Sequence, residues 1–272
     1  MSRSKKVAVI MSVYKNDKLV FLTDAVDSIL NQSYECDFFI YRDGLVDESI
    51  QAYLDHLSNN PRVNIFSSDV NHGLAFALNN LIDKVIERKY DYIARMDSDD
   101  ISRPERLSKQ IEFLDKNIDI GVCGTSCKEF GASYSLAEKH LPQSHNELVD
   151  FSIVRCPFIH PTVVFRIGVF SDGVRYPTKT HFTEDMALWF HLLKNGVKFY
   201  NINEVLLEYR LDELTIARRH GFDKAKSEFS LRIKNMLEMR KVSIRNVVMI
   251  SSRLAFHILP ISIMKWMYKS FR

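Results

Sequence analysis

The chain has 272 residues, 46% of them hydrophobic and 26% charged, and carries a formal net charge of +3 at pH 7. This length supports one large α/β domain with a modest appendage, and the hydrophobic content excludes a disordered chain. The most apolar stretch, residues 247–268, contains Arg253, Pro260 and Lys265, so no run of about 20 uncharged residues is available to cross a bilayer.

Strands and helices alternate along the first 124 residues. Apolar runs of strand length predict the strands, and apolar positions with helical spacing predict the helices. Since parallel neighbours require helical crossovers, this order predicts a mostly parallel central sheet with helices on both faces. Ligands of such sheets bind at the carboxyl ends of the strands. The expected strands are 6–13, 38–41, 63–66, 90–96 and 120–124, and the expected helices end near residues 30, 57, 88 and 116.

The second half of the chain is less regular. Residues 125–160 give no clear pattern, whereas Thr183 and Gly196 are expected to cap and terminate a strongly apolar helix. The elements expected after residue 160 are a strand at 162–166, that helix at 185–194, short strands at 197–200 and 205–209, and long amphipathic helical patterns at 211–240 and 243–269.

Three carboxylates follow the predicted strand 90–96. In an extended chain Asp97 and Asp99 point to the same side and Asp100 faces away. Converging carboxylates suit Mg²⁺ or Mn²⁺, whose coordination is usually completed by substrate phosphates such as those of a nucleotide diphosphate. The alternatives are a structural acidic loop, in which Asp100 caps the helix expected to start at Pro104, and a calcium loop. The calcium loop fails on spacing, because serines occupy the positions of its required Gly and Glu.

Two further turns belong to the same rim of the predicted sheet. Asp43-Gly44 ends the second strand, where a carboxylate can accept hydrogen bonds from a nucleobase or a ribose. Asn71-His72-Gly73 precedes a helix whose N-terminal N–H groups favour a phosphate. Taken alone, each is also an ordinary turn or helix-start signal.

Taken together, these motifs resemble the inverting glycosyltransferases of family 2. The resemblance covers about residues 6–210 and implies the GT-A nucleotide-diphospho-sugar transferase fold. More narrowly, the chain resembles the branch that builds bacterial O-antigen, capsule and exopolysaccharide repeat units, through His160-Pro161-Thr162-Val163 and Tyr209-Arg210. The motifs that carry the family resemblance are Ser12-Val13-Tyr14-Lys15-Asn16, Asp43-Gly44, Asn71-x-Gly73 with Asn79, Asp97-x-Asp99-Asp100 with Pro104 and Arg106-Leu107, and Thr183-Glu184-Asp185.

The resemblance implies a role for each matching residue. Asp43 would contact the base, and Asp97 and Asp99 would contact the ribose, the diphosphate and a Mn²⁺ or Mg²⁺ ion. Arg42 stands where relatives often have a second Asp, which leaves Asp43 as the acid of that turn. The motif and membrane-spanning helices of processive synthases are absent from the sequence, which favours transfer of a single residue. Further nucleotide-sugar contacts are expected from Ser12, Tyr14, Asn71, Gly73 and Ser98.

The resemblance implies that the pair Glu184-Asp185 supplies the catalytic base, with Asp185 as the proton acceptor. An inverting transfer needs one carboxylate to accept the proton of the attacking hydroxyl, and a bound metal would neutralise the leaving diphosphate. The alternative is structural, because acids are favoured in the first turn of any helix by the helix dipole.

The C-terminal segment carries most of the positive charge. Residues 218–272 contain 13 Lys and Arg against three acids, a local balance of +10 that leaves about −7 for the rest. Arg218 and Arg219 could clamp the diphosphate of a lipid-linked acceptor, with His160 as a further acceptor contact, although each could equally be structural. A basic amphipathic helix can lie on an anionic membrane surface or pack its apolar stripe on the domain. Nucleic acid is not an expected partner, because no nucleic-acid-reading motif accompanies the charge.

The beginning of the chain favours a cytoplasmic protein. Its basic start passes into Tyr14 and Lys15 without a small-residue cleavage site, and the four cysteines do not fit a zinc site, so reduced thiols are expected. With the charge of residues 218–272, this predicts a peripheral location at the inner face of the cytoplasmic membrane.

The expected organisation is a GT-A domain over residues 1–210, with a nucleotide-binding half, 1–100, and an acceptor and catalytic half, 101–210. A basic helical extension, 211–272, follows. The expected function is transfer of one hexose or N-acetylhexosamine from a UDP-sugar to a lipid-diphosphate-linked sugar. The alternatives are an inactive membrane-associated scaffold of the same fold and a sugar nucleotidyltransferase, although the latter would need a Gly-rich loop after the first strand.

Overall fold

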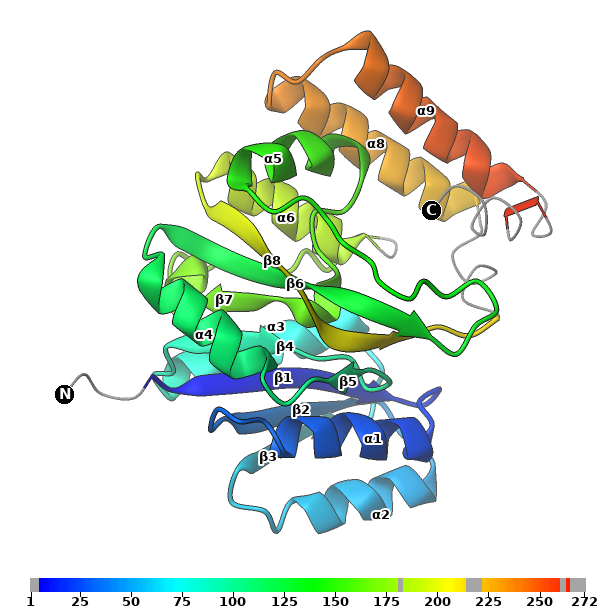
Figure 1. The fold of residues 1–272 in the computed structure, drawn as a ribbon. Helices are drawn as coiled ribbons and strands as arrows, with labels where there is room; N and C mark the ends of the chain where they lie inside the picture. The colour runs from blue at the N-terminus through cyan, green and yellow to red at the C-terminus, as the bar shows by residue number, and fades with distance from the viewer. Residues whose placement is uncertain (1–4, 181–182, 214–221, 260–262, 265–272) are drawn as a thin grey trace.

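The computed structural model describes residues 5–180, 183–213, 222–259 and 263–264 (Figure 1). The strands are β1 Val7–Tyr14, β2 Asp37–Asp43, β3 Val63–Ser68, β4 Tyr92–Arg95, β5 Ile101–Ser102, β6 Ile120–Phe130, β7 Val164–Arg166 and β8 Lys198–Arg210. The helices are α1 Leu19–Leu30, α2 Glu48–Leu57, α3 Leu74–Glu87, α4 Arg106–Lys116, α5 His145–Val154, α6 Glu184–Lys194, α8 Phe222–Glu238 and α9 Ile244–Ile258, with 3₁₀ turns η1 His160–Thr162 and η2 Ile167–Phe170.

Within the described residues the strands form an eight-stranded sheet in the order β3-β2-β1-β4-β7-β6-β8-β5. β1 pairs in parallel with β2 and β4, β2 with β3, and β6 with β8. β7 runs antiparallel to both of its neighbours, and β5 runs antiparallel to β8. The predicted α/β fold with a mostly parallel sheet is therefore confirmed, with β7 and β5 as the antiparallel members.

The central strand β1 explains why the sheet is covered on both faces. Its side chains alternate, so that Val9 and Met11 join the core under α1, α2 and α4, whereas Ala8 and Ile10 join the core under α3 and α6. All four side chains are fully buried. A strand buried on both faces is apolar throughout, which is the pattern that made this half of the chain predictable.

The C-terminal helices α8 and α9 pack against α5 and α6 (Figure 1). A third apolar cluster joins Ile153 of α5, Met186 and Phe190 of α6, Met236 of α8 and Ile250 of α9. The helices predicted at 211–240 and 243–269 are confirmed over α8, α9 and residues 263–264, and corrected at residues 211–213, which are not helical, and at the ends of α8 and α9, Glu238 and Ile258. Residues 214–221, 260–262 and 265–269 of these predictions lie outside the described residues. No helix of the described chain has the length and apolarity that crossing a bilayer requires.

Four further expectations are corrected. The irregular segment 125–160 contains the end of β6 and the helix α5, whose first turn carries a capping box between Ser144 and Glu147. The two strands expected at 197–209 are one strand, because pairing with β6 resumes at Val205 after an irregularity that skips residues 203–204. The two-residue strand β5 was not predicted, and α4 begins at Arg106, two residues after Pro104.

Candidate active site

The carboxyl ends of β1, β2 and β4 lie at one edge of the sheet because the three strands run in parallel. Tyr14 ends β1 beside Asp43, which ends β2, and Asp97 follows the last residue of β4 by two positions. The strand order reverses here, since β1 lies between β2 and β4. In open α/β sheets this reversal marks the ligand-binding crevice.

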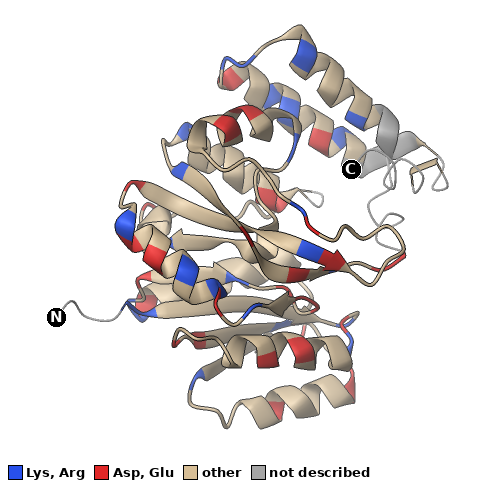
Figure 2. Ribbon diagram, in the orientation of Figure 1, with Lys and Arg blue, Asp and Glu red and all other residues tan. Residues whose placement is uncertain are grey.

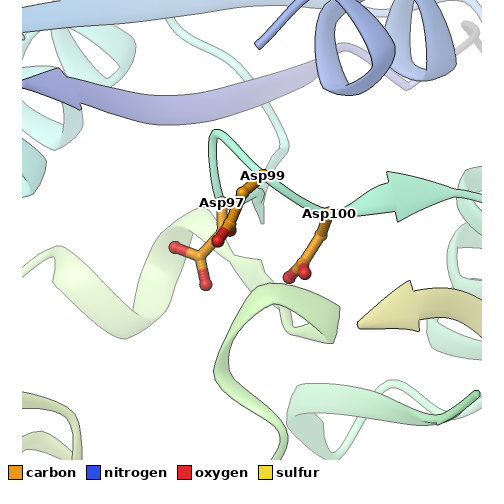
Figure 3. Close-up of side chains that lie close together, drawn as sticks. All are labelled: Asp97, Asp99 and Asp100. Carbon is orange, nitrogen blue, oxygen red and sulfur yellow. The ribbon is translucent and has the colours of Figure 1, made fainter. Parts of the chain in front are cut away.

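Three carboxylates of the segment 97–100 converge at this edge (Figure 3). Oxygen atoms of Asp97, Asp99 and Asp100 all lie within 4.8 Å of one another. The prediction that Asp100 faces away was wrong, because β4 ends at Arg95 and the segment forms a turn, in which the alternation of a strand no longer holds. Asp100 also does not cap α4. Its Oδ1 accepts a hydrogen bond from the main-chain N–H of Arg210 at 2.7 Å.

Electrostatic repulsion is concentrated in this acidic turn, the name used below for residues 97–100. Burial, together with the charges of Asp97 and Asp17, raises the pKa of Asp99 to about 7. Burial and the charges of Asp97 and Asp99 raise the pKa of Asp100 well above its usual range. Asp17, which was not predicted as a site residue, is a fourth carboxylate here, and burial raises its pKa to about 6. The side chain of Ser98 hydrogen-bonds Asp17, so the segment after β1 is linked to the acidic turn.

Two arginines offset part of this negative charge. Arg95, whose side chain is 1% exposed, forms an ion pair with Asp97, and its Nε and Nη1 have no hydrogen-bond partner among the described residues. Arg210 donates from Nε to the main-chain oxygen of Asp99 at 2.7 Å and pairs with Asp24 of α1 at 3.0 Å. Its guanidinium stacks on the ring of Phe21 at 3.9 Å. The contacts of these two arginines with the acids were not predicted.

The acidic turn suits a divalent cation. The second oxygen of Asp100 is buried and has no hydrogen-bond partner within the described part of the chain, beside the oxygens of Asp97 and Asp99. Carboxylate oxygens are the ligands that Mg²⁺ and Mn²⁺ favour, and a cation would stabilise the ionised forms that burial now opposes. The residues present therefore fit the expected metal.

Asp43 organises the neighbouring loop. Its two carboxylate oxygens accept the main-chain N–H groups of His72 and Gly73, each at 2.8 Å, and its main-chain oxygen accepts the amide N–H of Asn71 at 2.9 Å. Gly73 has a φ of 92°, and a Cβ at this position would meet no atom within 4 Å. The N-terminus of α3 thus opens onto unfilled space beside Asp43. A carboxylate has about four acceptor positions, so Asp43 retains capacity for a ligand.

Glu184 and Asp185 form the first turn of α6, as predicted. The Oδ2 of Asp185 lies 3.5 Å from the thiol of Cys156, and its Oδ1 accepts the N–H of Met186 at 2.7 Å. Tyr176 is close to both this pair and the acidic turn. Burial raises the pKa of Tyr176, and the charges of Asp185, Glu184 and Asp97 add to that effect.

His160 lies at the start of the 3₁₀ turn η1, so its expected place at the start of a strand is corrected. The hydrogen bonds of Ile159 to Thr162 close this turn before β7 begins. Its Nε2 is 2.9 Å from the hydroxyl of Tyr176, and burial lowers its pKa well below the usual range, so the ring is neutral. Asn79 of α3 holds the main chain of Tyr176 through two hydrogen bonds of 2.8 Å. Tyr176 and Asn79 therefore position His160 behind the site.

Of the remaining predicted site residues, the structure describes Ser12 and Tyr14. Ser12 is half-buried near the end of β1, and Tyr14 is exposed at the rim. Arg218 and Arg219 lie outside the described residues.

A mixed sheet whose strand order reverses beside an acidic turn is characteristic of the GT-A glycosyltransferases. The model of glycosyl transferase family 2 matches residues 8–188, and the chain belongs to this family.

Its relatives include glycosyltransferases of amylovoran and O-antigen biosynthesis. The UDP-Gal:alpha-D-GlcNAc-diphosphoundecaprenol beta-1,3-galactosyltransferase of Escherichia coli is 30% identical over 275 residues, which cover 97% of this chain and 95% of the relative. The amylovoran biosynthesis glycosyltransferase AmsE of Erwinia amylovora is 29% identical, covering 97% and 98%. Among solved structures, a mannosyltransferase of Pyrobaculum calidifontis in complex with GDP-Man and Mn²⁺ matches with a TM-score of 0.64 at 13% identity, covering 98% of this chain and 74% of that chain. This last likeness is one of fold.

Proposed function

We propose that this glycosyltransferase moves a single hexose or N-acetylhexosamine, with inversion, from a UDP-sugar to a lipid-diphosphate-linked sugar. Residues 1–100 would bind the nucleotide, residues 101–210 would bind the acceptor, and residues 211–272 would form an extension at the membrane. The galactosyltransferase relative, by its name, uses this kind of donor and this kind of acceptor.

The acidic turn is the observation that carries this proposal. Asp97, Asp99 and Asp100 would hold Mn²⁺ or Mg²⁺, and a bound ion supplies charge neutralisation for a diphosphate leaving group. Asp43 and the N-terminus of α3 would hold the nucleotide on the neighbouring strand end, where Gly73 leaves open space. Tyr14 at the rim and Ser12 behind it would complete the donor side, with Asn71 holding the loop and Ser98 contacting Asp17.

Asp185 would accept the proton of the acceptor hydroxyl. It begins α6, its carboxylate is held by the Cys156 thiol and the N–H of Met186, and its charge acts on Tyr176 together with that of Asp97. An inverting attack requires a fixed carboxylate beside the acceptor hydroxyl, on the side of the anomeric carbon opposite the leaving diphosphate. Glu184, the preceding residue, would contribute charge to the same turn. His160 and Tyr176 would form the wall behind the acceptor, and Arg218 and Arg219 would contact its diphosphate.

The extension would meet the membrane through the connection between α8 and α9. Val242, Ile244 and Val248 are exposed there, close in sequence to the exposed Arg240 and Arg245. Figure 2 shows Lys and Arg recurring along both helices. Exposed aliphatic side chains among basic ones suit an anionic lipid surface. The opposite side of α9 packs on the domain through Ile250. The helix would thus use one side for the membrane and the other side for packing on the domain.

A donor screen tests the proposed reaction. Purified protein is incubated with a panel of UDP-sugars, Mn²⁺ and a synthetic lipid-diphosphate-linked sugar, and product is followed by mass spectrometry. The expected result is acceptor-dependent release of UDP and a product whose anomeric configuration, determined by NMR, is opposite to that of the donor. Retained configuration, or full activity in EDTA, would contradict inversion or metal dependence respectively.

A vesicle experiment tests the membrane surface separately. Ile244→Asp with Val248→Asp should reduce sedimentation with vesicles of anionic lipid, whereas Ile118→Asp should not. Ile118 is a matched control because it is 83% exposed, against 86% for Ile244, and lies before β6, far from α8 and α9 in sequence. Deleting α9 would be a poor test, since it also removes the buried Ile250. Equal sedimentation of the two variants would reject the hairpin as the membrane surface.

A further inference from the structure

A buried ionic network joins the two helices of the C-terminal hairpin, α8 and α9. Glu228 of α8 accepts hydrogen bonds from Arg232 on the same helix and from Arg253 of α9, both at 2.8 Å. Arg232 is 2% exposed and Glu228 is 7% exposed. Arg253 is partly exposed, whereas the guanidinium of Arg232 is buried and needs acceptors for its remaining N–H groups.

Arg232 finds those acceptors on α5. Its Nη1 donates to the main-chain oxygens of Ser152 and Ile153, at 3.0 and 3.1 Å. These oxygens belong to the last turn of α5, where carbonyl groups have no partner within the helix. A cation at this end is also favoured by the helix dipole. The guanidinium therefore fixes the end of α5, although it comes from a helix that begins about 70 residues later.

The residues just after α5 contact the proposed base, Asp185. Three residues beyond Ile153, the thiol of Cys156 contacts the Oδ2 of Asp185 at 3.5 Å. The next residue of α6, Met186, packs in the same apolar cluster as Met236 of α8 and Ile250 of α9. The hairpin thus supports the first turn of α6 in two ways, through Arg232 and α5 on one side and through apolar packing on the other.

We propose that Arg232 is a positioning residue for Asp185, and that the C-terminal hairpin is a working part of the catalytic half. This inference rests on the proposed role of Asp185 as proton acceptor. Arg232 holds the last turn of α5, the segment after it holds the Cys156 thiol against Asp185, and the thiol keeps one carboxylate oxygen oriented. Loss of the guanidinium frees the end of α5 and lets the carboxylate rotate, so turnover falls while the donor side, built from β1, β2 and β4, is unaffected.

The first test compares Arg232→Met with Lys116→Met, which removes an exposed cation of α4 that pairs with Glu112. Turnover with saturating donor and acceptor is measured beside the dissociation constant of UDP by calorimetry. Arg232→Met should lower kcat at least tenfold and change UDP affinity less than twofold, and Lys116→Met should change neither. Equal loss of kcat and UDP affinity, or no loss of kcat in a folded protein, would overturn the proposal.

A second pair of variants acts at the other end of the contact path and leaves the hairpin intact. Cys156→Ser keeps a hydrogen-bond donor to Asp185 and should retain most turnover, whereas Cys156→Val removes it and should lose turnover by a factor similar to that of Arg232→Met. This pair decides the question if Arg232→Met does not fold, which thermal denaturation would reveal. Equal kcat for the serine and valine variants would reject the contact path.

A double-variant cycle separates this inference from the proposed function. If Asp185 is the base, Asp185→Asn loses turnover, and adding Arg232→Met should cause little further loss, because both changes act on the same carboxylate. Normal turnover in Asp185→Asn alone would remove the proposed base itself. A collapse in Asp185→Asn with fully additive loss from Arg232→Met would leave the base in place and reject Arg232 as its positioning residue.

Discussion

Asp43 and Asp99 lie at the same edge of the sheet but in opposite surroundings. Asp43 ends β2 with both oxygens hydrogen-bonded to the main chain before α3, at 2.8 Å each. Asp99 lies in a turn beside Asp97 and Asp17, where burial and like charge raise its pKa to about 7. The protein supplies hydrogen bonds to the carboxylate of Asp43, whereas it destabilises the ionised form of Asp99.

Asp43 therefore organises a loop without a ligand, whereas we expect the ionised form of Asp99 to be stabilised by a bound cation. Hydrogen bonds to main-chain N–H groups stabilise a buried carboxylate without any ligand. Clustered buried carboxylates instead destabilise the ligand-free protein, and a cation reverses the sign of their contribution. Substitutions at the two places should therefore have opposite effects on stability.

The largest effect is expected from Asp99→Asn. Removing one carboxylate from the proposed metal site should reduce activity by about three orders of magnitude, since charge stabilisation of the leaving group contributes several kcal/mol. Mn²⁺ binding, followed by electron paramagnetic resonance, should be lost in parallel. Asp172→Asn, an exposed acid in the loop after η2, is the control and should retain both. Full Mn²⁺ affinity in Asp99→Asn would exclude Asp99 as a ligand.

The same variant should be more stable than the wild type when metal is absent. Folding raises the pKa of Asp99 from 3.8 to about 7, so its stabilising contribution is complete below about pH 4 and is lost as the pH rises through 7. Asparagine does not titrate. The advantage of Asp99→Asn should therefore be absent near pH 4, grow between pH 4 and 7 and remain constant above. Urea denaturation of EDTA-treated proteins across this range measures it, and a constant difference at every pH would contradict the assignment.

Asp185→Asn should rank second. The variant keeps the shape of the side chain but removes its basicity, and loss of a general base costs about 10²–10⁴-fold in turnover. Affinity for the UDP-sugar should survive, because Asp185 lies on α6 and not among the strand ends that hold Asp43 and the acidic turn. Glu184→Gln, on the same turn, should cost less. Loss of donor binding together with turnover would make Asp185 a donor-site residue instead.

Arg210 provides an intermediate test, because it touches the acidic turn without being a ligand. Arg210→Met removes the hydrogen bond to the oxygen of Asp99 and the ion pair with Asp24. Partners that orient metal ligands typically contribute about 10–100-fold in metal affinity. We expect a loss of that size for Mn²⁺, measured by calorimetry. Arg103→Met is the control, since Arg103 pairs with Glu208 of β8 but not with the turn. Equal losses in both variants would indicate general damage to β8.

The smallest effect on turnover is expected at Asp43. Asp43→Asn leaves one of the two N–H groups of the loop without its acceptor, which should destabilise the protein by about 1–3 kcal/mol. UDP affinity should fall about tenfold while kcat at saturating donor changes little. Asp69→Asn, whose exposed side chain pairs with Arg42, should change stability by less than about 1 kcal/mol. An increase in the stability of the Asp43→Asn protein would contradict the expected opposite effects of substitutions at Asp43 and Asp99.

The elements of the first 100 residues were largely predictable because the central strands are buried on both faces and the helices have one apolar side. Sequence also placed Asp43, Asp97 and Asp99 at one edge, since the carboxyl ends of parallel strands coincide. α5 was not predicted, as its apolar residues surround the helix and only Leu148, Ser152 and Ile153 are buried.

The partners of the charged residues were harder to predict. Asp100 meets the N–H of a residue 110 positions away, and Arg210 meets Asp24 at a separation of 186 positions. Spacing along the chain carries no information about such pairs. A polar segment at the end of β1 could have indicated Asp17, and a charged residue within an otherwise buried strand could have indicated that Arg95 has a charged partner.

The contact between Asp100 and Arg210 also bears on the order in which the protein folds. β1, β2, β3 and β4 come from the first 100 residues and can pair as soon as they are synthesised, but Asp99 and Asp100 obtain their hydrogen bonds with Arg210 only after β8 joins β6. Pairings of large sequence separation form slowly. We therefore expect recovery of Mn²⁺ binding during refolding to lag behind the recovery of helical circular dichroism. Simultaneous recovery of the two signals would contradict this order. Until β8 arrives, the nascent chain carries β1 to β4 and an acidic turn that lacks its contacts with Arg210, and completion of these contacts would therefore report that β8 has joined the sheet.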